Sequence, residues 1–133
     1  ANEKQEFKTD LKIVIDSQYN EGPLRGLVDT LNATKAERML LLAVDLPKMP
    51  INFLGELIYS GCGTIPVHKN GMTEPLAAVY PKSLIKLAEK NLKLGILKMQ
   101  TFTAQAIDEG FLKERPIKDS EISFFENLNY SNI

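Results

Sequence analysis

Apolar residues occur along the chain in short runs that are separated by polar turn signals. The run over residues 39–44 is almost continuously apolar and ends at Asp45, and Pro47 and Pro50 follow closely. A short apolar run bounded by turn residues is typical of a strand that is buried on both faces, as in a parallel sheet. The two prolines forbid further strand pairing. The sequence therefore predicts a buried strand that ends at a loop containing Asp45.

The stretch before this run predicts a strand followed by a helix. Residues 11–15 are apolar and β-branched, which is typical of a strand. Residues 23–33 read as a helix, because proline suits the first helical turn and Pro23 stands there. Four apolar residues recur on one face of this helix at helical spacing: Leu24, Leu27, Val28 and Leu31.

After Pro50 the pattern predicts a helix, a hairpin and two more helices. Pro66 interrupts the first hairpin strand and indicates an edge position or a bulge. Asn70-Gly71 is a strong hairpin-turn signal. The expected helices cover residues 51–60, 81–92 and 96–102, the hairpin strands 62–68 and 75–80, and two short strands 103–108 and 122–125. Residues 110–120 are expected to be irregular.

Alternating strands and helices indicate parallel βαβ units and a three-layer α/β fold. We expect a mostly parallel sheet with an antiparallel hairpin at its edge. A length of 133 residues fits one domain, residues 1–133, with a substantial core.

Composition and charge exclude several classes of function. The chain is 44% hydrophobic and 25% charged with a formal net charge of −1, so bulk charge gives no case for nucleic acid or an anionic membrane. Cys62 is the only cysteine, which excludes an intramolecular disulfide and a cysteine zinc site. No apolar stretch is long enough to span a bilayer, and no signal peptide is recognisable. We expect a cytoplasmic protein with neither nucleic-acid nor membrane partners.

Two carboxylates follow predicted strands, Asp16 after residues 11–15 and Asp45 after residues 39–44. A βαβ unit would make these strands neighbours, and ligands of open α/β sheets bind beyond the carboxyl ends of strands. A carboxylate there can bind a hard cation such as Mg²⁺ together with substrate phosphates. Asp45 could equally cap the next helix or start a turn.

The loop before the predicted helix at 23–33 contains Gly22 and Gly26. Glycine lets backbone amides approach a ligand, and a helix N-terminus attracts phosphate. The alternative is a tight strand-to-helix turn, with Arg25 as a solvated helix residue.

Four further polar residues, His68, Glu74, Asn127 and Asn129, are considered for a structural or a ligand-binding role. His68 is the only histidine and has no partner at metal-ligand spacing, so we interpret it as structural, with Glu74 as a charged turn residue. Asn127 and Asn129 would point to the same side of an extended segment, where their amides could bind a polar heterocycle or cap turns.

Five stretches in order resemble the molybdenum cofactor guanylyltransferase family of nucleotidyltransferases, whose fold is like that of nucleotide-diphospho-sugar transferases. Gly22-Pro23-Leu24-Arg25-Gly26 after Asp16 resembles its Gly-Pro-Leu-x-Gly motif, and Val44-Asp45-Leu46-Pro47 its Cys-Asp-x-Pro strand end. Three further stretches resemble family motifs: Ala1-Asn2-Glu3-Lys4-Gln5-Glu6, Glu74-Pro75-Leu76-Ala77-Ala78-Val79-Tyr80 and Phe125-Glu126-Asn127-Leu128-Asn129. Glu74 stands where the family has His or Gln.

The resemblance implies an Mg²⁺-dependent enzyme that transfers GMP from GTP to molybdopterin and releases pyrophosphate. By position Asp45 would be the catalytic metal ligand. Four residues would contact the nucleotide: Asn2, Asp16, Gly22 and Gly26. Asn127 and Asn129 would lie near the pterin.

The family's opening Gly-rich phosphate loop does not occur in this sequence, which by this resemblance would start about where the family's second or third strand ends. We therefore expect an N-terminally truncated form of the fold that forms a homo-oligomer or associates with a missing segment, because an unpaired strand edge would otherwise be exposed. Two other functions remain open: a non-catalytic module that binds a nucleotide, a pterin or a partner protein, and a transferase that uses another nucleotide or acceptor.

Overall fold

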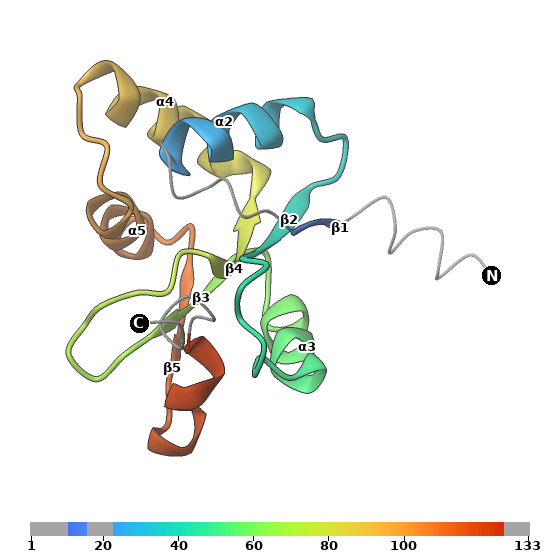
Figure 1. Ribbon diagram of the computed structural model, residues 1–133. Coiled ribbons are helices and arrows are strands. Elements are labelled where there is room, and N and C mark those ends of the chain that lie inside the picture. Colours follow the sequence, from blue (N-terminus) through green and yellow to red (C-terminus); the bar gives the residue numbers. More distant parts are fainter. Residues whose placement is uncertain (1–10, 16–22, 127–133) are drawn as a thin grey trace.

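The computed structural model describes residues 11–15 and 23–126 (Figure 1). The described segments form five strands, four α-helices and two 3-10 helices. In chain order they are β1 (Leu11–Ile15), α2 (Pro23–Ala33), β2 (Arg38–Leu42), α3 (Ile51–Tyr59), β3 (Thr64–Val67), β4 (Ala77–Pro81), η2 (Lys82–Leu84), α4 (Ile85–Lys93), α5 (Met99–Asp108), β5 (Lys113–Pro116) and η3 (Asp119–Phe125).

The strands form one sheet in the order β1-β2-β4-β3-β5. β1 runs parallel to β2, and β3 runs parallel to β5, whereas β4 is antiparallel to both of its neighbours. Four of the five strands therefore share one direction. The predicted α/β fold with a mostly parallel sheet is confirmed.

The first βαβ unit forms as the sequence predicts. α2 begins at Pro23, and β1 and β2 are direct neighbours in register from Leu11↔Arg38 to Ile15↔Leu42. Within β2, Met39, Leu40 and Leu41 are at most 2% exposed. β2 is thus buried on both faces, as the continuous apolar run predicts.

Helices cover both faces of the sheet, so the fold has three layers (Figure 1). On one face Met39 and Leu41 of β2 pack with residues of α2, α4 and α5. On the other face Leu40 packs with Phe53 and Leu57 of α3 and with the two phenylalanines of η3, Phe124 and Phe125.

Three predictions for the C-terminal third are wrong. Residues 103–108 form the second half of α5 instead of a strand, because the buried residues Met99, Phe102, Thr103 and Ala106 repeat at helical spacing. Residues 122–125 are part of η3 and not a strand. β5 lies inside the segment predicted to be irregular, where Lys113-Glu114-Arg115-Pro116 has no apolar alternation to reveal a strand.

The predicted edge position of the hairpin is also wrong. β3 lies between β4 and β5, and β4 lies between β2 and β3. Pro66 is tolerated there because the β3–β4 ladder contains only the pair Thr64↔Val79, so Pro66 is beyond the end of that ladder. The predicted turn at Asn70-Gly71 does form, with the Gly71 amide donating to the His68 carbonyl (2.9 Å) and Gly71 at φ +89°.

Across the described ranges, 11–15 and 23–126, none of the helices is long and apolar enough to cross a membrane.

Candidate functional site

The carboxyl ends of β1, β2, β3 and β5 lie on one side of the sheet, because these strands share a direction. Antiparallel β4 begins on that side. We call this side the carboxyl edge. Ligands of open α/β sheets bind beyond such an edge, so the polar groups there define the candidate site.

Asp45 lies in the loop that follows β2, three residues beyond Leu42, and is half-buried. The Ala43 amide donates to the Leu76 carbonyl (2.8 Å), which holds the start of the loop against the segment before β4. The N-cap of α3 is Pro50 and no side chain caps that helix. Asp45 is therefore not the cap of α3, and of the structural alternatives for this residue the turn remains.

Glu74 lies in the loop that precedes β4, beside the loop of Asp45. The β2–β4 register pairs Leu42 with Ala77, and the Ala77 amide donates to the Glu74 carbonyl (3.2 Å), so residues 74–77 form a turn at the start of β4. The hydrogen bond between Ala43 and Leu76 continues this register beyond the strands. The loop of Asp45 and the loop of Glu74 thus leave the sheet side by side.

Glu74 pairs with His68 at the end of β3. The His68 Nε2 atom lies 2.6 Å from the Glu74 Oε2 atom, and the two side chains are 25% and 29% exposed. The His68 ring also contacts Phe125 edge-on, with ring centroids 5.8 Å apart. Sequence reasoning interpreted the two residues separately and missed the pair. Their positions on either side of the Asn70-Gly71 turn are the signal that could have revealed it.

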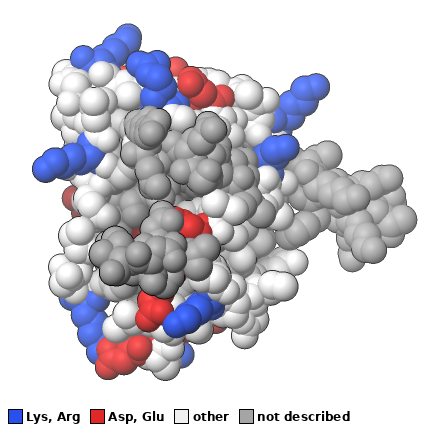
Figure 2. All heavy atoms as spheres, in the orientation of Figure 1, with Lys and Arg blue, Asp and Glu red and all other residues white. Residues whose placement is uncertain are grey.

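Residues 119–126, which we call the C-terminal segment, are attached to two loops at the carboxyl edge. Lys48, three residues after Asp45, pairs with Glu126 (2.6 Å), and Lys69 pairs with Asp119 (2.8 Å). All four side chains are more than half exposed, so each pair is worth only about 0–1 kcal/mol. Figure 2 shows cationic and anionic side chains interspersed over the described part of this face, in keeping with the net charge of −1.

Arg115 of β5 is the centre of a second charge cluster. The side chains of Arg115 and Glu121 are less exposed than those of the two pairs above. The two terminal nitrogens of Arg115 contact both carboxylate oxygens of Glu121 (2.7 and 2.8 Å). Arg115 also pairs with Glu56 of α3 (3.0 Å), and its guanidinium lies 4.8 Å from the Phe53 ring centroid. The hydrogen bonds between Arg115 and Glu121 raise the pKa of Arg115 and lower the pKa of Glu121. This cluster joins β5 to α3 and η3, so we interpret it as structural.

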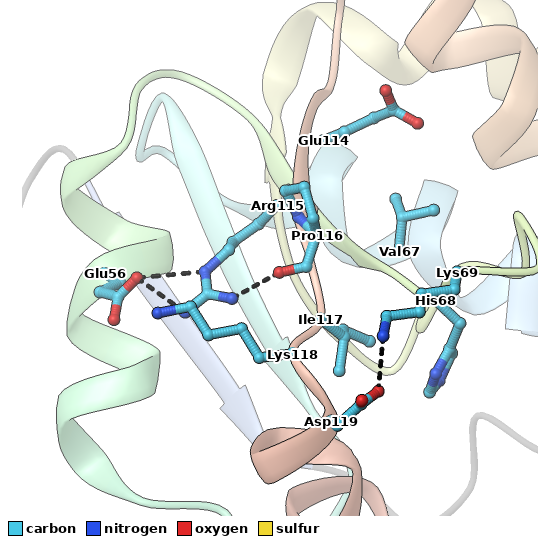
Figure 3. Close-up of a pocket in the computed structure, with 10 residues that line it drawn as sticks. All are labelled: Glu56, Val67, His68, Lys69, Glu114, Arg115, Pro116, Ile117, Lys118 and Asp119. Atoms are coloured by element: carbon cyan, nitrogen blue, oxygen red, sulfur yellow. Dashed lines mark hydrogen bonds and ion pairs between the residues drawn. The ribbon is translucent and has the colours of Figure 1, made fainter.

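A pocket of about 740 Å³ lies around the ends of β3 and β5 (Figure 3). Arg115 and Glu56 lie on one side of it and His68, Lys69 and Asp119 on another (Figure 3). Its volume is in the range of small-molecule sites. The pocket adjoins the carboxyl edge on the side away from β1.

The carboxylate of Asp45 is chemically suited to be one ligand of Mg²⁺ at a site whose other ligands are waters and substrate phosphates. Within 11–15 and 23–126, no group of three or more His, Cys, Asp or Glu side chains could hold a metal ion. Mg²⁺ is commonly bound through one or two carboxylates, with waters and substrate phosphates completing the shell. A single half-buried carboxylate at the end of β2 is compatible with that arrangement.

Among the other predicted site residues, only Gly26 lies within the described ranges. It is half-buried in the first turn of α2, next to Arg25, which is exposed as predicted. Asn2, Asp16, Gly22, Asn127 and Asn129 lie outside the described residues. Cys62 is an exposed free thiol.

Three comparisons relate the chain to known proteins. The MobA-like NTP transferase domain family matches residues 1–108. A protein of Opitutus terrae named "Probable molybdenum cofactor guanylyltransferase" is 32% identical over 114 residues, which are 81% of this chain and 56% of that protein. A protein of the same name from Clostridium perfringens (strain 13) is 30% identical over 137 residues, covering 97% of this chain and 68% of that protein.

A solved structure has the same fold. Molybdopterin-guanine dinucleotide biosynthesis protein A from Archaeoglobus fulgidus superposes with a TM-score of 0.63 at 24% identity, covering 81% of this chain and 56% of that chain. The chain thus spans 56–68% of the length of these three proteins. Because the family match extends over most of the sequence, the chain belongs to the MobA-like NTP transferase domain family.

Proposed function

We propose that this chain is the greater part of a nucleotidyltransferase of molybdenum cofactor biosynthesis, which transfers GMP from GTP to the terminal phosphate of molybdopterin. The observation that carries the proposal is the position of Asp45, half-buried just beyond the buried strand β2 in a member of the MobA-like NTP transferase domain family. The names of the relatives from Opitutus and Clostridium support this reaction class and this acceptor.

In the proposed reaction an acceptor phosphate oxygen attacks the α-phosphorus of GTP. A new phosphoanhydride bond forms, the bond between the α-phosphorus and the bridging oxygen breaks, and pyrophosphate leaves. Mg²⁺, when bound, neutralises charge on the phosphates. Positioning and charge stabilisation are most of what such a transfer requires of the protein.

The residues of this chain have distinct parts in that reaction. Asp45 holds the metal. Asp16, Gly22, Gly26 and Asn2 contact the guanine nucleotide, and Asn127 and Asn129 lie near the pterin. The direct pairing of β1 with β2 supports a shared site for the segments that follow these two strands.

Calorimetry with single nucleotides tests the proposal. The chain is titrated with GTP, ATP and CTP in the presence of MgCl₂ and again with EDTA. We expect GTP to bind more tightly than ATP and CTP, and its affinity to fall when Mg²⁺ is removed. If no nucleotide binds in either condition, the proposed transferase activity of this chain is contradicted, and a module that binds a pterin or a partner protein is favoured.

A further inference from the structure

The polar pair of His68 and Glu74 lies on one side of Asp45 along the carboxyl edge. The strand order places β1 on one side of β2, and β4 and β3 on the other. Neighbouring strands are about 4.8 Å apart, so His68 at the end of β3 is about 10 Å from the line of β2. A transfer reaction at Asp45 needs its two substrates on either side of it. With the nucleotide proposed on the β1 side, the second substrate approaches from the side of Glu74 and His68.

The backbone around Glu74 is held firmly. The Glu74 amide donates to the Pro66 carbonyl (3.0 Å). At the preceding residue, the Thr73 amide donates to Gln100 Oε1 (2.9 Å), and Gln100 Nε2 donates to the Thr73 carbonyl (2.8 Å). These bonds fix the hairpin to α5. The carboxylate of Glu74 is therefore presented to His68 from a rigid support, as a preorganised binding group requires.

The Glu74 contact leaves the second ring nitrogen of His68 available. When Nε2–H donates to Glu74, the neutral ring carries a lone pair on Nδ1, which accepts a hydrogen bond. Across 23–126 no hydrogen bond to Nδ1 occurs, and His68 is partly exposed. Phe125 contacts the same ring edge-on and adds an apolar surface next to His68. A hydrogen-bond acceptor next to an aromatic ring suits a flat heterocycle that carries an amino group.

We propose that His68 binds the amino-bearing heterocycle of the acceptor substrate, and that Glu74 is the positioning residue that orients the His68 ring. This inference rests on the proposed function, which supplies the acceptor as a pterin. A guanine base has the same donor chemistry, so the nucleotide is the competing source of such a group.

Binding of a pterin and of a nucleotide is measured separately on the full 133-residue chain. The probes are pterin-6-carboxylate, followed by its fluorescence, and GTP with MgCl₂, followed by calorimetry. The variants are His68→Leu, Glu74→Ala and Glu74→Gln. Lys69→Ala is the matched control, because Lys69 lies on the same hairpin and pairs only with Asp119 among the described residues.

We expect His68→Leu and Glu74→Ala to weaken pterin binding about fivefold to tenfold, the size of one lost hydrogen bond. Glu74→Gln keeps an acceptor oxygen for Nε2–H and should restore most of that affinity. GTP binding should be unchanged in all variants. Thermal melting identifies any variant that fails to fold, and the two Glu74 variants then suffice for the test.

The other outcomes separate a failure of this inference from a failure of the proposed function. Equal pterin affinity in the wild type, Glu74→Ala and Lys69→Ala overturns it, and so does pterin binding too weak to measure in the wild type. Loss of GTP affinity in His68→Leu with unchanged pterin affinity assigns His68 to the nucleotide instead. Failure of the wild type to bind GTP contradicts the proposed function, whereas the pterin measurements still decide the role of His68.

Discussion

The centre of the sheet and its β5 edge are held together by different kinds of interaction. In the centre, β2 is apolar, and Met39, Leu40 and Leu41 are packed on both faces by helices. At the edge, β5 reads Lys113-Glu114-Arg115-Pro116 and has no fully buried side chain. It is attached instead through Arg115 to Glu121 and Glu56. The centre is stabilised by burial of apolar side chains, whereas β5 is attached by the hydrogen bonds and ion pairs of Arg115.

This difference explains what the sequence predicts and what it does not. The apolar pattern predicts β1, α2, β2 and α3 nearly to the residue, because burial on a defined face leaves a periodic signal. β5 leaves no such signal. Its Arg115 pairs with Glu56, which is 59 positions earlier in the sequence, and with Glu121, which belongs to η3. The pairing of Glu74 with His68 depends on the path of the hairpin, and only their positions on either side of the Asn70-Gly71 turn indicate it in the sequence.

The largest expected effect is in the centre. Leu41→Ala removes a fully buried side chain that packs between β2 and the α2 layer, and should lower the free energy of unfolding by about 2–5 kcal/mol. Chemical denaturation measures the loss. Leu42→Ala, at a half-buried position next in the same strand, is the control and should cost clearly less. Equal losses would contradict the account of a densely packed centre.

A smaller but definite effect is expected at Arg115. Arg115→Met keeps an apolar side chain at this position but removes the guanidinium from the Phe53 ring and leaves the 12%-exposed Glu121 carboxylate without its cation. We expect a loss of about 2–3 kcal/mol, below the full range for a buried pair because the cluster is partly solvated. Lys113→Met, an exposed change in the same strand, should have little effect. If Arg115→Met leaves the free energy of unfolding unchanged, β5 is held by its backbone hydrogen bonds alone.

The same cluster makes stability depend on pH in the acid range. Arg115 lowers the pKa of Glu121 in the folded state, so the unfolded chain binds more protons between the folded value and the ordinary unfolded value of about 4.3. This contribution is present above that ordinary value and is lost as the pH falls through the folded pKa. Glu121→Gln should therefore flatten the decline of the melting temperature below about pH 4.5. An unchanged acid profile in Glu121→Gln would contradict the assignment.

The smallest effect is expected at the exposed pair of Lys69 and Asp119. Both side chains are more than 70% exposed, so Lys69→Ala should change stability by less than about 1 kcal/mol and become indistinguishable from the wild type at high salt. Denaturation curves at low and high ionic strength measure this. A larger, salt-resistant loss would show that the C-terminal segment depends on this pair for its attachment.

The central claim is that Asp45 holds the metal that accompanies the nucleotide, and one comparison tests it most directly. GTP is titrated calorimetrically into the wild type and Asp45→Asn, each with MgCl₂ and with EDTA, and the melting temperature of both is recorded. The account predicts that Asp45→Asn loses the Mg²⁺-dependent part of the affinity, about tenfold or more, with nearly unchanged melting. Asp45→Asn that binds GTP with Mg²⁺ as tightly as the wild type, or that melts far lower, would contradict it and leave Asp45 as a structural turn residue.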